Sequence, residues 1–347
     1  MDLEERLSLI LREPTEEVVT GQELRTLLET VARPKHYIGL EISGILHLGS
    51  LILTGFKIND LIKAKVECTV FLADWHTYIN NKLQGDWEKI REFSQYYADA
   101  FRFFCPGVSI ELGSDLYQRT NNYWIDFVQF SKQISLSRTI RSLTIMGRTE
   151  NEKLDLAQLL YPPMQSVDIK ALDLDIVHAG MDQRKIHMLV REIFPKFGWK
   201  IPVSIHHHIL PGLSEPSKAD SNNNYNEAEN FSKMSKSNPS SSILVHDDES
   251  TITEKIIKGY CPPTVVENNP ILELIRYVIF HEYKEFIVER PQKYGGNVTY
   301  SNFKELERSY TENKIHPKDL KSATAEYINR IIRPVREHFK GREPDLS

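Results

Sequence analysis

The chain has 347 residues, of which 40% are hydrophobic and 26% are charged, and its formal net charge is −5. This length suffices for about two domains with hydrophobic cores, and the balanced composition excludes a disordered or fibrous protein. Because it carries neither a long apolar run nor a secretory signal, we expect a cytoplasmic protein without membrane spans. Cys68, Cys105 and Cys261 lie far apart, which predicts free thiols rather than disulfides or a zinc site.

Residues 1–33 are predicted to be helical, because Thr20-Gly21 precedes an amphipathic run that Pro34 ends. A buried strand, a tight glycine loop and a helix start follow between Tyr37 and Ser50. Helix N-termini present unpaired N–H groups and a partial positive charge, so this arrangement is suited to binding phosphate. Many such turns carry glycine for geometry alone, and the local pattern leaves both interpretations open.

Alternating strands and helices continue along the chain. Strands are predicted at 66–73, 108–112, 174–178 and 201–209, with helices at 86–104 and from about Gln183. This alternation predicts a parallel sheet covered on both faces, and ligands bind beyond the carboxyl ends of such strands. Polar residues and glycines expected at that edge are Ser43, His47, Asp74, His76, Gly180 and Asp182.

The run His206-His207-His208 is a candidate metal-binding motif. Neighbouring side chains alternate between the two faces of a strand, so only His206 and His208 could share an ion. The nearby sequence offers no third ligand, and packing at a strand end is the favoured interpretation. No metal site is therefore predicted.

The composition changes sharply over 214–242, which is long and polar and is expected to form a mobile loop. The loop contains Lys233-Met234-Ser235-Lys236-Ser237. Helical patterns then follow at 249–260, 269–289, 301–311 and 317–338. They predict a second, mostly α-helical domain over 246–347.

Two of these motifs together resemble the signatures of class I aminoacyl-tRNA synthetases. The motif 233–237 matches the family residue for residue, and His47-Leu48-Gly49-Ser50 matches except that Ser50 stands where a second histidine is usual. Other segments are similar to the archaeal and eukaryal type of tyrosyl-tRNA synthetase. They are 37–41, 161–165, 167–169, 180–187, 260–262, 291–296 and 316–321. The similarity extends from about residue 20 to residue 338.

The resemblance implies a tyrosine–tRNA ligase, which joins tyrosine to ATP to form tyrosyl-adenylate and pyrophosphate and then transfers tyrosine to the 3′ end of tRNA(Tyr). It implies a Rossmann-like parallel-sheet catalytic domain over 34–245, with a dimer-forming insertion at about 110–160, and an anticodon-binding domain over 246–347. The protein would be a homodimer. Mg²⁺ would accompany ATP rather than occupy a site of the protein.

The same resemblance assigns roles to individual residues. The catalytic residues are His47, Lys233 and Lys236, and the tyrosine-binding residues are Tyr37, Tyr161, Gln165, Asp168 and Gln183. The ATP-binding residues are Gly39, Gly49, Gly180 and Asp182 with the two lysines. For tRNA, the resemblance assigns Tyr294, His316 and Asp319 to the anticodon. Arg141, which lies in a basic stretch, and Arg184, which directly follows Gln183, are the candidates for the acceptor end.

The spacing of the tyrosine-binding residues supports their assignment. On a helix, separations of four and seven residues place Tyr161, Gln165 and Asp168 on one face. A pocket that hydrogen-bonds the phenol hydroxyl can discriminate against phenylalanine by about 10⁴ to 10⁵. Core packing is the alternative for Tyr37 and Tyr161, but an acid and an amide on one apolar face are rarely buried without a purpose.

Three alternatives stay open at the level of sequence. A tryptophan–tRNA ligase shares the fold, but Tyr37 together with Asp168 favours a phenol over an indole. A non-catalytic, synthetase-like RNA-binding protein would be expected to lose His47 or the loop lysines, and this chain keeps them. A nucleotidyltransferase of related fold would not need the helical C-terminal domain.

Overall fold

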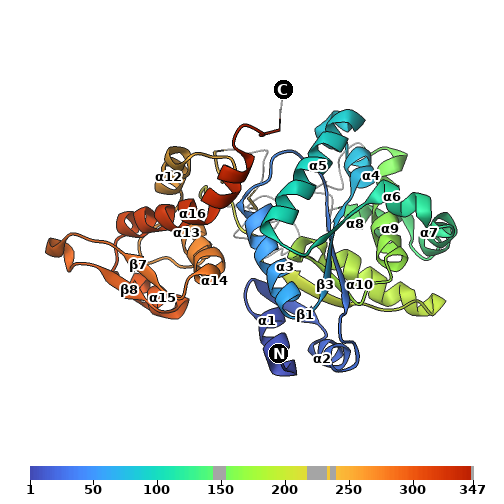
Figure 1. Cartoon of the computed structure of the whole chain (residues 1–347), viewed down its shortest axis with the longest axis horizontal. Coiled ribbons are helices and arrows are strands. Elements are labelled where there is room, and N and C mark those ends of the chain that lie inside the picture. The colour runs from blue at the N-terminus through green and yellow to red at the C-terminus, as the bar shows by residue number, and fades with distance from the viewer. Residues whose placement is uncertain (144–153, 217–232, 235–239, 345–347) are drawn as a thin grey trace. The chain divides into compact units, whose positions relative to one another are not determined.

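The computed structural model describes residues 1–143, 154–216, 233–234 and 240–344 (Figure 1). The chain forms two compact units, Met1–Gly44 with Lys57–His208, and Ile45–Phe56 with Ile209–Asp345. Among the helices of the described ranges, none combines the length and the apolar character needed to cross a membrane.

A six-stranded sheet of order β1-β6-β5-β2-β3-β4 forms the centre of the first unit. Its strands are β1 (Thr15–Val19), β2 (Lys35–Leu40), β3 (Glu67–Leu72), β4 (Ser109–Leu112), β5 (Ile176–Gly180) and β6 (Val203–His207). Strands β2 to β6 pair in parallel, which confirms the predicted fold class, whereas β1 pairs antiparallel with β6.

The strand β1 corrects the prediction that residues 1–33 are entirely helical. Helices α1 (Leu3–Leu11) and α2 (Gly21–Thr30) flank it. Glu17 on β1 accepts hydrogen bonds from Arg184 and pairs with His206, both far along the chain. These distant contacts, rather than local propensity, make this short acidic segment a strand.

Helices surround the sheet (Figure 1). They are α3 (Thr54–Lys63), which spans the boundary of the two units, α4 (Asp74–Ile79), η2 (Lys82–Gly85), α5 (Trp87–Phe104), α6 (Gly113–Arg119), α7 (Tyr123–Ser131), α8 (Leu136–Ser142), α9 (Leu156–Ala171), η4 (Met181–Gln183), α10 (Arg184–Ile193) and η5 (Phe194–Phe197). One core cluster joins Tyr37 and Val177 of the sheet to Tyr161 and Val167 of α9. The Asp155–Gln158 capping box starts α9, so the helix predicted to carry Tyr161, Gln165 and Asp168 is confirmed.

The second unit is mostly helical after its first segments. Its elements are η1 (Leu48–Leu53), α12 (Glu249–Lys258), α13 (Pro270–Leu274), η6 (Ile275–Ile279), α14 (Phe280–Glu282), β7 (Phe286–Val288), η7 (Gln292–Tyr294), β8 (Val298–Tyr300), α15 (Phe303–Thr311) and α16 (Pro317–Phe339). Helix α3 continues directly from η1.

The hairpin of β7 and β8 corrects the prediction of one helix over 269–289. Helical structure ends at Glu282, and Phe286 and Val288 then alternate with the exposed Ile287. That two-residue period belongs to a strand, and the turn between the strands contains Gly295 and Gly296 at positive φ. The predicted loop over 214–242, including Lys236, lies largely outside the described residues.

Candidate active site

Asp168 is the centre of a buried polar cluster in the first unit, which also contains Tyr117, Tyr123 and His76 and is called the Asp168 cluster below. The Tyr123 hydroxyl donates to Asp168 Oδ1 at 2.6 Å, and the Tyr117 hydroxyl donates to Oδ2 at 3.4 Å. Only 1% of Asp168 is exposed. Burial raises the pKa of its carboxyl to about 8, although the two tyrosine hydrogen bonds oppose this shift.

His76, from the start of α4, completes the cluster. Its Nε2 lies 3.6 Å from Asp168 Oδ2, and its ring meets Tyr161 edge-on at 4.5 Å between ring centres. Burial lowers the pKa of His76 to about 3, so the ring is neutral near pH 7. Within the described residues, His76 Nε2 is buried without a hydrogen-bond partner. Buried polar atoms are normally paired, so this atom marks a place for a ligand group.

The other predicted tyrosine-binding residues converge beside the cluster. Gln165 Nε2 donates to Gln183 Oε1 at 3.2 Å, and Gln165 also hydrogen-bonds the Tyr37 side chain. Gln165 Oε1 is a second buried atom that has no partner in the described part of the chain. Burial, followed by the nearby Asp168 charge, raises the pKa of Tyr37, so its hydroxyl keeps its proton. The structure thus brings together all five residues predicted to bind tyrosine.

Tyr117 and Tyr123 are functional candidates that sequence reasoning missed. They lie on α6 and α7, more than forty residues before Asp168, and no periodic pattern connects them to α9. Asp74 accepts N–H groups from Ser114 at 3.0 Å and Trp75 at 2.8 Å, which anchors the start of α6 to the end of β3. The only sequence signal was the concentration of aromatic residues just after the predicted strand at 108–112.

The predicted ATP-binding residues of this unit lie at the same edge of the sheet. Gly39 is in β2, Gly180 is the last residue of β5, and Asp182 follows in η4. A Cβ on Gly39 would lie 3.3 Å from the Tyr37 ring, so a side chain there would crowd the pocket wall. The Asp182 charge acts on both Tyr161 and His207, which places it close to the cluster.

His47 caps the helical turn η1 in the second unit. Its Nδ1 accepts the N–H groups of Gly49 at 3.2 Å and Ser50 at 3.3 Å, while Ser50 Oγ accepts the His47 N–H at 2.9 Å. A neutral imidazole carries its proton on the nitrogen that does not accept. His47 Nε2 is therefore an N–H donor held in a fixed orientation. A Cβ on Gly49 would lie 3.2 Å from the His47 ring, so the close approach suits glycine.

Lys233 is held next to the same helical turn. It forms an isolated β-bridge with Pro211, and the adjacent Met234 N–H donates to the Leu210 carbonyl at 2.7 Å. Leu210 lies 4.0 Å from a Cβ placed on Gly49. Lys236 lies outside the described residues. Within this unit, the backbone at Lys233, a predicted catalytic residue, is thus connected through Leu210 to the turn that begins at His47.

The predicted anticodon-binding residues lie on two segments of the second unit. Tyr294 ends η7 and is 61% exposed, with the Lys293 ammonium 4.9 Å from the centre of its ring. His316 caps α16, and Asp319 lies in the first turn of that helix. Arg290 connects the segments, because Nε donates to the Gly296 carbonyl and Nη1 to the Lys314 carbonyl, each at 3.1 Å.

The two predicted acceptor-end residues lie on separate helices. Arg141 is exposed on α8. Arg184 begins α10, and its Nε donates to both carboxylate oxygens of Glu17 at 3.0 and 2.8 Å. That pairing raises the pKa of Arg184 and lowers the pKa of Glu17. The two acceptor-end candidates thus come from different helices of the first unit.

Within the histidine triplet, His206 and His207 are buried and His208 is partly exposed. His206 Nε2 lies 2.9 Å from His187 Nδ1, His207 Nδ1 lies 2.8 Å from His178 Nε2, and His208 pairs with Glu16. In the described ranges, no group of three or more histidine, cysteine, aspartate or glutamate residues is arranged to hold a metal ion.

Comparisons with known proteins agree with this geometry. Residues 30–333 match the family described as tRNA synthetases class I (W and Y). The chain is 44% identical to the tyrosine–tRNA ligase of Pyrococcus furiosus, covering 99% of this chain and 97% of the relative. It also matches the crystal structure of tyrosyl-tRNA synthetase from Pyrococcus horikoshii complexed with L-tyrosine. That match has a TM-score of 0.91 and 43% identity, over 98% of this chain and 97% of the other.

Proposed function

The chain belongs to the class I tRNA synthetases for tryptophan and tyrosine, and we propose how its side chains perform the reaction of that family. Its activity is that of a tyrosine–tRNA ligase, which activates tyrosine with ATP and transfers it to tRNA. The tryptophan alternative is set aside, because relatives at 42–44% identity over the full length are tyrosine–tRNA ligases.

The Asp168 cluster is the observation that carries the assignment of the amino-acid pocket. The phenol O–H of tyrosine donates to Asp168, whose orientation is fixed by Tyr123 and Tyr117. At the other end of the substrate, the unpaired Gln165 Oε1 accepts from the α-ammonium group, with Tyr161 and Gln183 beside it. Burying a carboxyl is costly, and the phenol hydroxyl adds a further hydrogen bond to those from Tyr123 and Tyr117.

In the activation step, a carboxylate oxygen of tyrosine bonds to the α-phosphorus of ATP as the bond to pyrophosphate breaks. Such a transfer needs charge stabilisation rather than a protein nucleophile. We assign the N–H of His47 Nε2 and the ammonium groups of Lys233 and Lys236 to the phosphate oxygens. Asp182 and Gly180 hold the ribose, Gly39 and Gly49 allow close approach, and Mg²⁺ arrives with ATP.

For tRNA, we assign Arg141 and Arg184 to the acceptor end and Tyr294, His316 and Asp319 to the anticodon. The exposed ring of Tyr294 supports this assignment, since unpaired bases are read by stacking together with hydrogen bonds to their edges. Arg290 keeps the loop of Tyr294 connected to the segment that leads into α16.

We also propose a homodimer that forms through the insertion at about 110–160. Helix α7 supports it, because Trp124, Ile125 and Val128 are 54%, 57% and 56% exposed on that short helix. Apolar side chains gathered in this way mark an association surface. A cytoplasmic location is proposed because Cys68, Cys105 and Cys261 are free thiols, which suits a reducing compartment.

An aminoacylation assay tests the proposed function directly. The purified protein is incubated with ATP, Mg²⁺, total tRNA and tyrosine, tryptophan or phenylalanine in turn. Tyrosine alone should support both pyrophosphate exchange and tRNA charging. Exchange stimulated by tryptophan but not tyrosine, or tRNA binding without any adenylate, would contradict the proposal.

The affinity for tyrosine should depend on pH through Asp168. Its pKa of about 8 lies above the ordinary value of 3.8, so below pH 8 the carboxyl holds a proton. A phenol O–H donates best to the ionised carboxylate, so binding releases that proton. The KM for tyrosine should therefore fall by up to about tenfold per pH unit as pH rises toward 8, and then level off. The KM for ATP, measured in the same exchange assay, serves as the control.

Replacing Tyr294 by alanine should impair tRNA charging without affecting activation. Stacking on an aromatic ring contributes about 1–3 kcal/mol per base, so kcat/KM for tRNA should fall about fivefold to a hundredfold. Tyr294→Phe keeps the ring and should retain most of the activity. Equal loss in both variants, or reduced tyrosine-dependent pyrophosphate exchange, would argue against a stacking role.

A further inference from the structure

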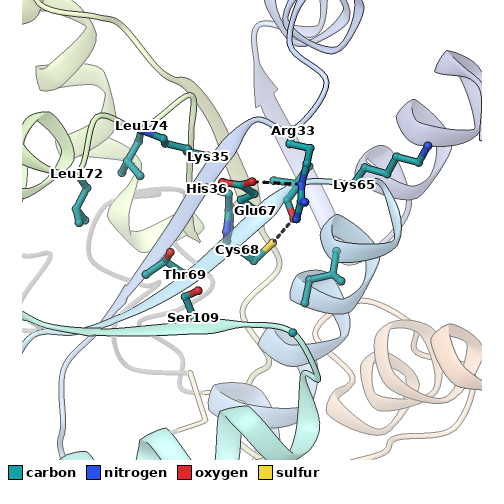
Figure 2. A pocket seen from close by; sticks show the side chains of 13 residues that line it. Arg33, Lys35, His36, Lys65, Glu67, Cys68, Thr69, Ser109, Leu172 and Leu174 are labelled. Carbon is teal, nitrogen blue, oxygen red and sulfur yellow. Dashed lines mark hydrogen bonds and ion pairs between the residues drawn. The ribbon is translucent and has the colours of Figure 1, made fainter.

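A cavity of about 720 Å³ lies in the first unit at the amino ends of β2, β3 and β4. It is at the opposite end of the strands from Gly180 and Asp182, and no assigned role uses it. Its polar lining includes Arg33, Lys35, His36, Glu67, Thr69 and Ser109, and Leu172 and Leu174 add apolar surface (Figure 2). This volume falls within the usual range for pockets that bind small molecules.

The charged groups of the lining are paired only weakly. Arg33 Nε lies 3.2 Å from Glu67, and these side chains are 71% and 48% exposed, so their ion pair is easily exchanged. Lys35 Nζ lies 3.2 Å from Asp173, but Lys200 also binds that carboxylate, at 2.7 Å. Figure 2 shows Arg33 and Lys35 on either side of His36, with the Lys65 ammonium directed away. Lys35 can therefore turn toward an anion without leaving Asp173 uncompensated, and the exposed Arg33 can exchange Glu67 for an anionic ligand.

His36 adds a buried polar atom to this wall. The residue is 1% exposed, and its Nδ1 has no hydrogen-bond partner in the described part of the chain. Its Nε2 lies 3.1 Å from His178 Nδ1. Burial lowers the pKa of His36 to about 3, so the ring is neutral. An unpaired imidazole nitrogen at a cavity wall is a position at which a ligand group can be satisfied.

We propose that this cavity binds a small organic anion, whose phosphate or carboxylate group is held by Arg33 and Lys35 and accepts the N–H of His36 Nδ1. The hydroxyl groups of Thr69 and Ser109 offer further hydrogen bonds to the body of the ligand. Leu172 and Leu174 contact its apolar part.

A chain of three histidines connects this site to the other end of the sheet. His36 Nε2 meets His178 Nδ1, and His178 Nε2 meets His207 Nδ1 at 2.8 Å. In a row of neutral imidazoles, each ring accepts at one nitrogen and donates at the other, so one proton position fixes the rest. An anion that holds the proton on His36 Nδ1 therefore leaves His207 Nε2 as an acceptor. His207 pairs with Gly180 in the sheet and experiences the Asp182 charge. The link to ATP binding rests on the ribose role proposed for Asp182.

Nuclear magnetic resonance of the full-length protein with ¹⁵N-labelled histidine tests this site. Inorganic phosphate and citrate serve as probes, and the His36 signals are assigned with His36→Gln. Either probe should shift the His36 nitrogens saturably and place the proton on Nδ1. The double variant Arg33→Ala/Lys35→Ala should weaken this binding at least about tenfold, the loss expected for charge-assisted hydrogen bonds. Lys63→Ala removes an exposed lysine of α3 that does not line the cavity, and it should leave the binding unchanged.

The titration tests two claims separately: that the cavity binds an anion, and that the three histidines connect it to ATP binding. No saturable shift of His36 at millimolar probe, or equal affinity in the double variant and in Lys63→Ala, overturns the site. A saturable shift of His36 that leaves the His207 signals unmoved supports the site and overturns the link. The titration needs no catalytic activity, so its result is independent of whether the protein charges tRNA. If the link holds, phosphate or citrate should also change the KM for ATP in the wild type but not in the double variant.

Discussion

Replacing Asp168 by alanine should reduce the discrimination between tyrosine and phenylalanine by about a hundredfold or more. The wild-type pocket is expected to favour tyrosine by about 10⁴ to 10⁵, because phenylalanine cannot supply the hydrogen bond that the phenol hydroxyl donates to the buried carboxyl. Without that carboxyl, the phenol hydroxyl loses its acceptor, and the ratio of kcat/KM values should fall to about 10² or below. Amino-acid-dependent pyrophosphate exchange measures both values on the same preparation.

Tyr123→Phe is the matched control for Asp168→Ala. The Tyr123 hydroxyl touches Asp168 and the Met164 carbonyl, and its hydrogen bond lowers the pKa of the carboxyl against the effect of burial. Removing it should raise that pKa further and weaken tyrosine binding near neutral pH, while phenylalanine stays a poor substrate. Unchanged discrimination in Asp168→Ala, with a normal melting temperature, would show that another group reads the hydroxyl.

The sequence predicted the part of this pocket that one helix carries. Tyr161, Gln165 and Asp168 share a face through helical periodicity, which acts over a few residues and can be read locally. Tyr117 and Tyr123 could not be found in this way. Their contact with Asp168 depends on where α6 and α7 pack against α9, and that arrangement is set by tertiary structure.

The two errors in secondary structure have the same physical origin. Residues 15–19 carry two glutamates in a short segment, yet pairing with β6 and the contacts of Glu17 make them a strand. Residues 286–288 lie in a segment with a helical pattern, yet they form one strand of a hairpin whose strands pair over three residues. Short strands gain most of their stability from partners distant in sequence, so local propensity describes them poorly.

The contact between His36, His178 and His207 is another feature that local sequence patterns could not predict. His36, His178 and His207 were each visible in the sequence, but only the parallel register of β2, β5 and β6 places their rings in a row. At Ser50, by contrast, the sequence showed a departure that only the structure explains. This residue departs from the usual pattern of the family, and the structure gives it a local task, since its hydroxyl oxygen accepts the His47 N–H at 2.9 Å.

Replacing His47 by asparagine should reduce the rate of tyrosyl-adenylate formation by about 10² to 10³, the effect of removing one donor from a site of developing charge. Asparagine can still accept the N–H groups of Gly49 and Ser50 with its side-chain oxygen, as His47 Nδ1 does. It cannot reach the position of the His47 Nε2 proton. Single-turnover formation of adenylate measures the loss, and the KM for tyrosine should change little.

His47→Gln is the complementary variant, because it should keep an N–H donor for the phosphates and lose the cap of η1. The glutamine amide can place an N–H near the position of Nε2 but does not cap η1 in the same way. The helix cap should therefore be lost at a cost of about 1 kcal/mol in the free energy of unfolding, while adenylate formation should exceed that of His47→Asn. If His47→Asn forms adenylate as fast as the wild type, His47 serves only as a cap, and the charge of the reacting phosphates must be stabilised by other groups.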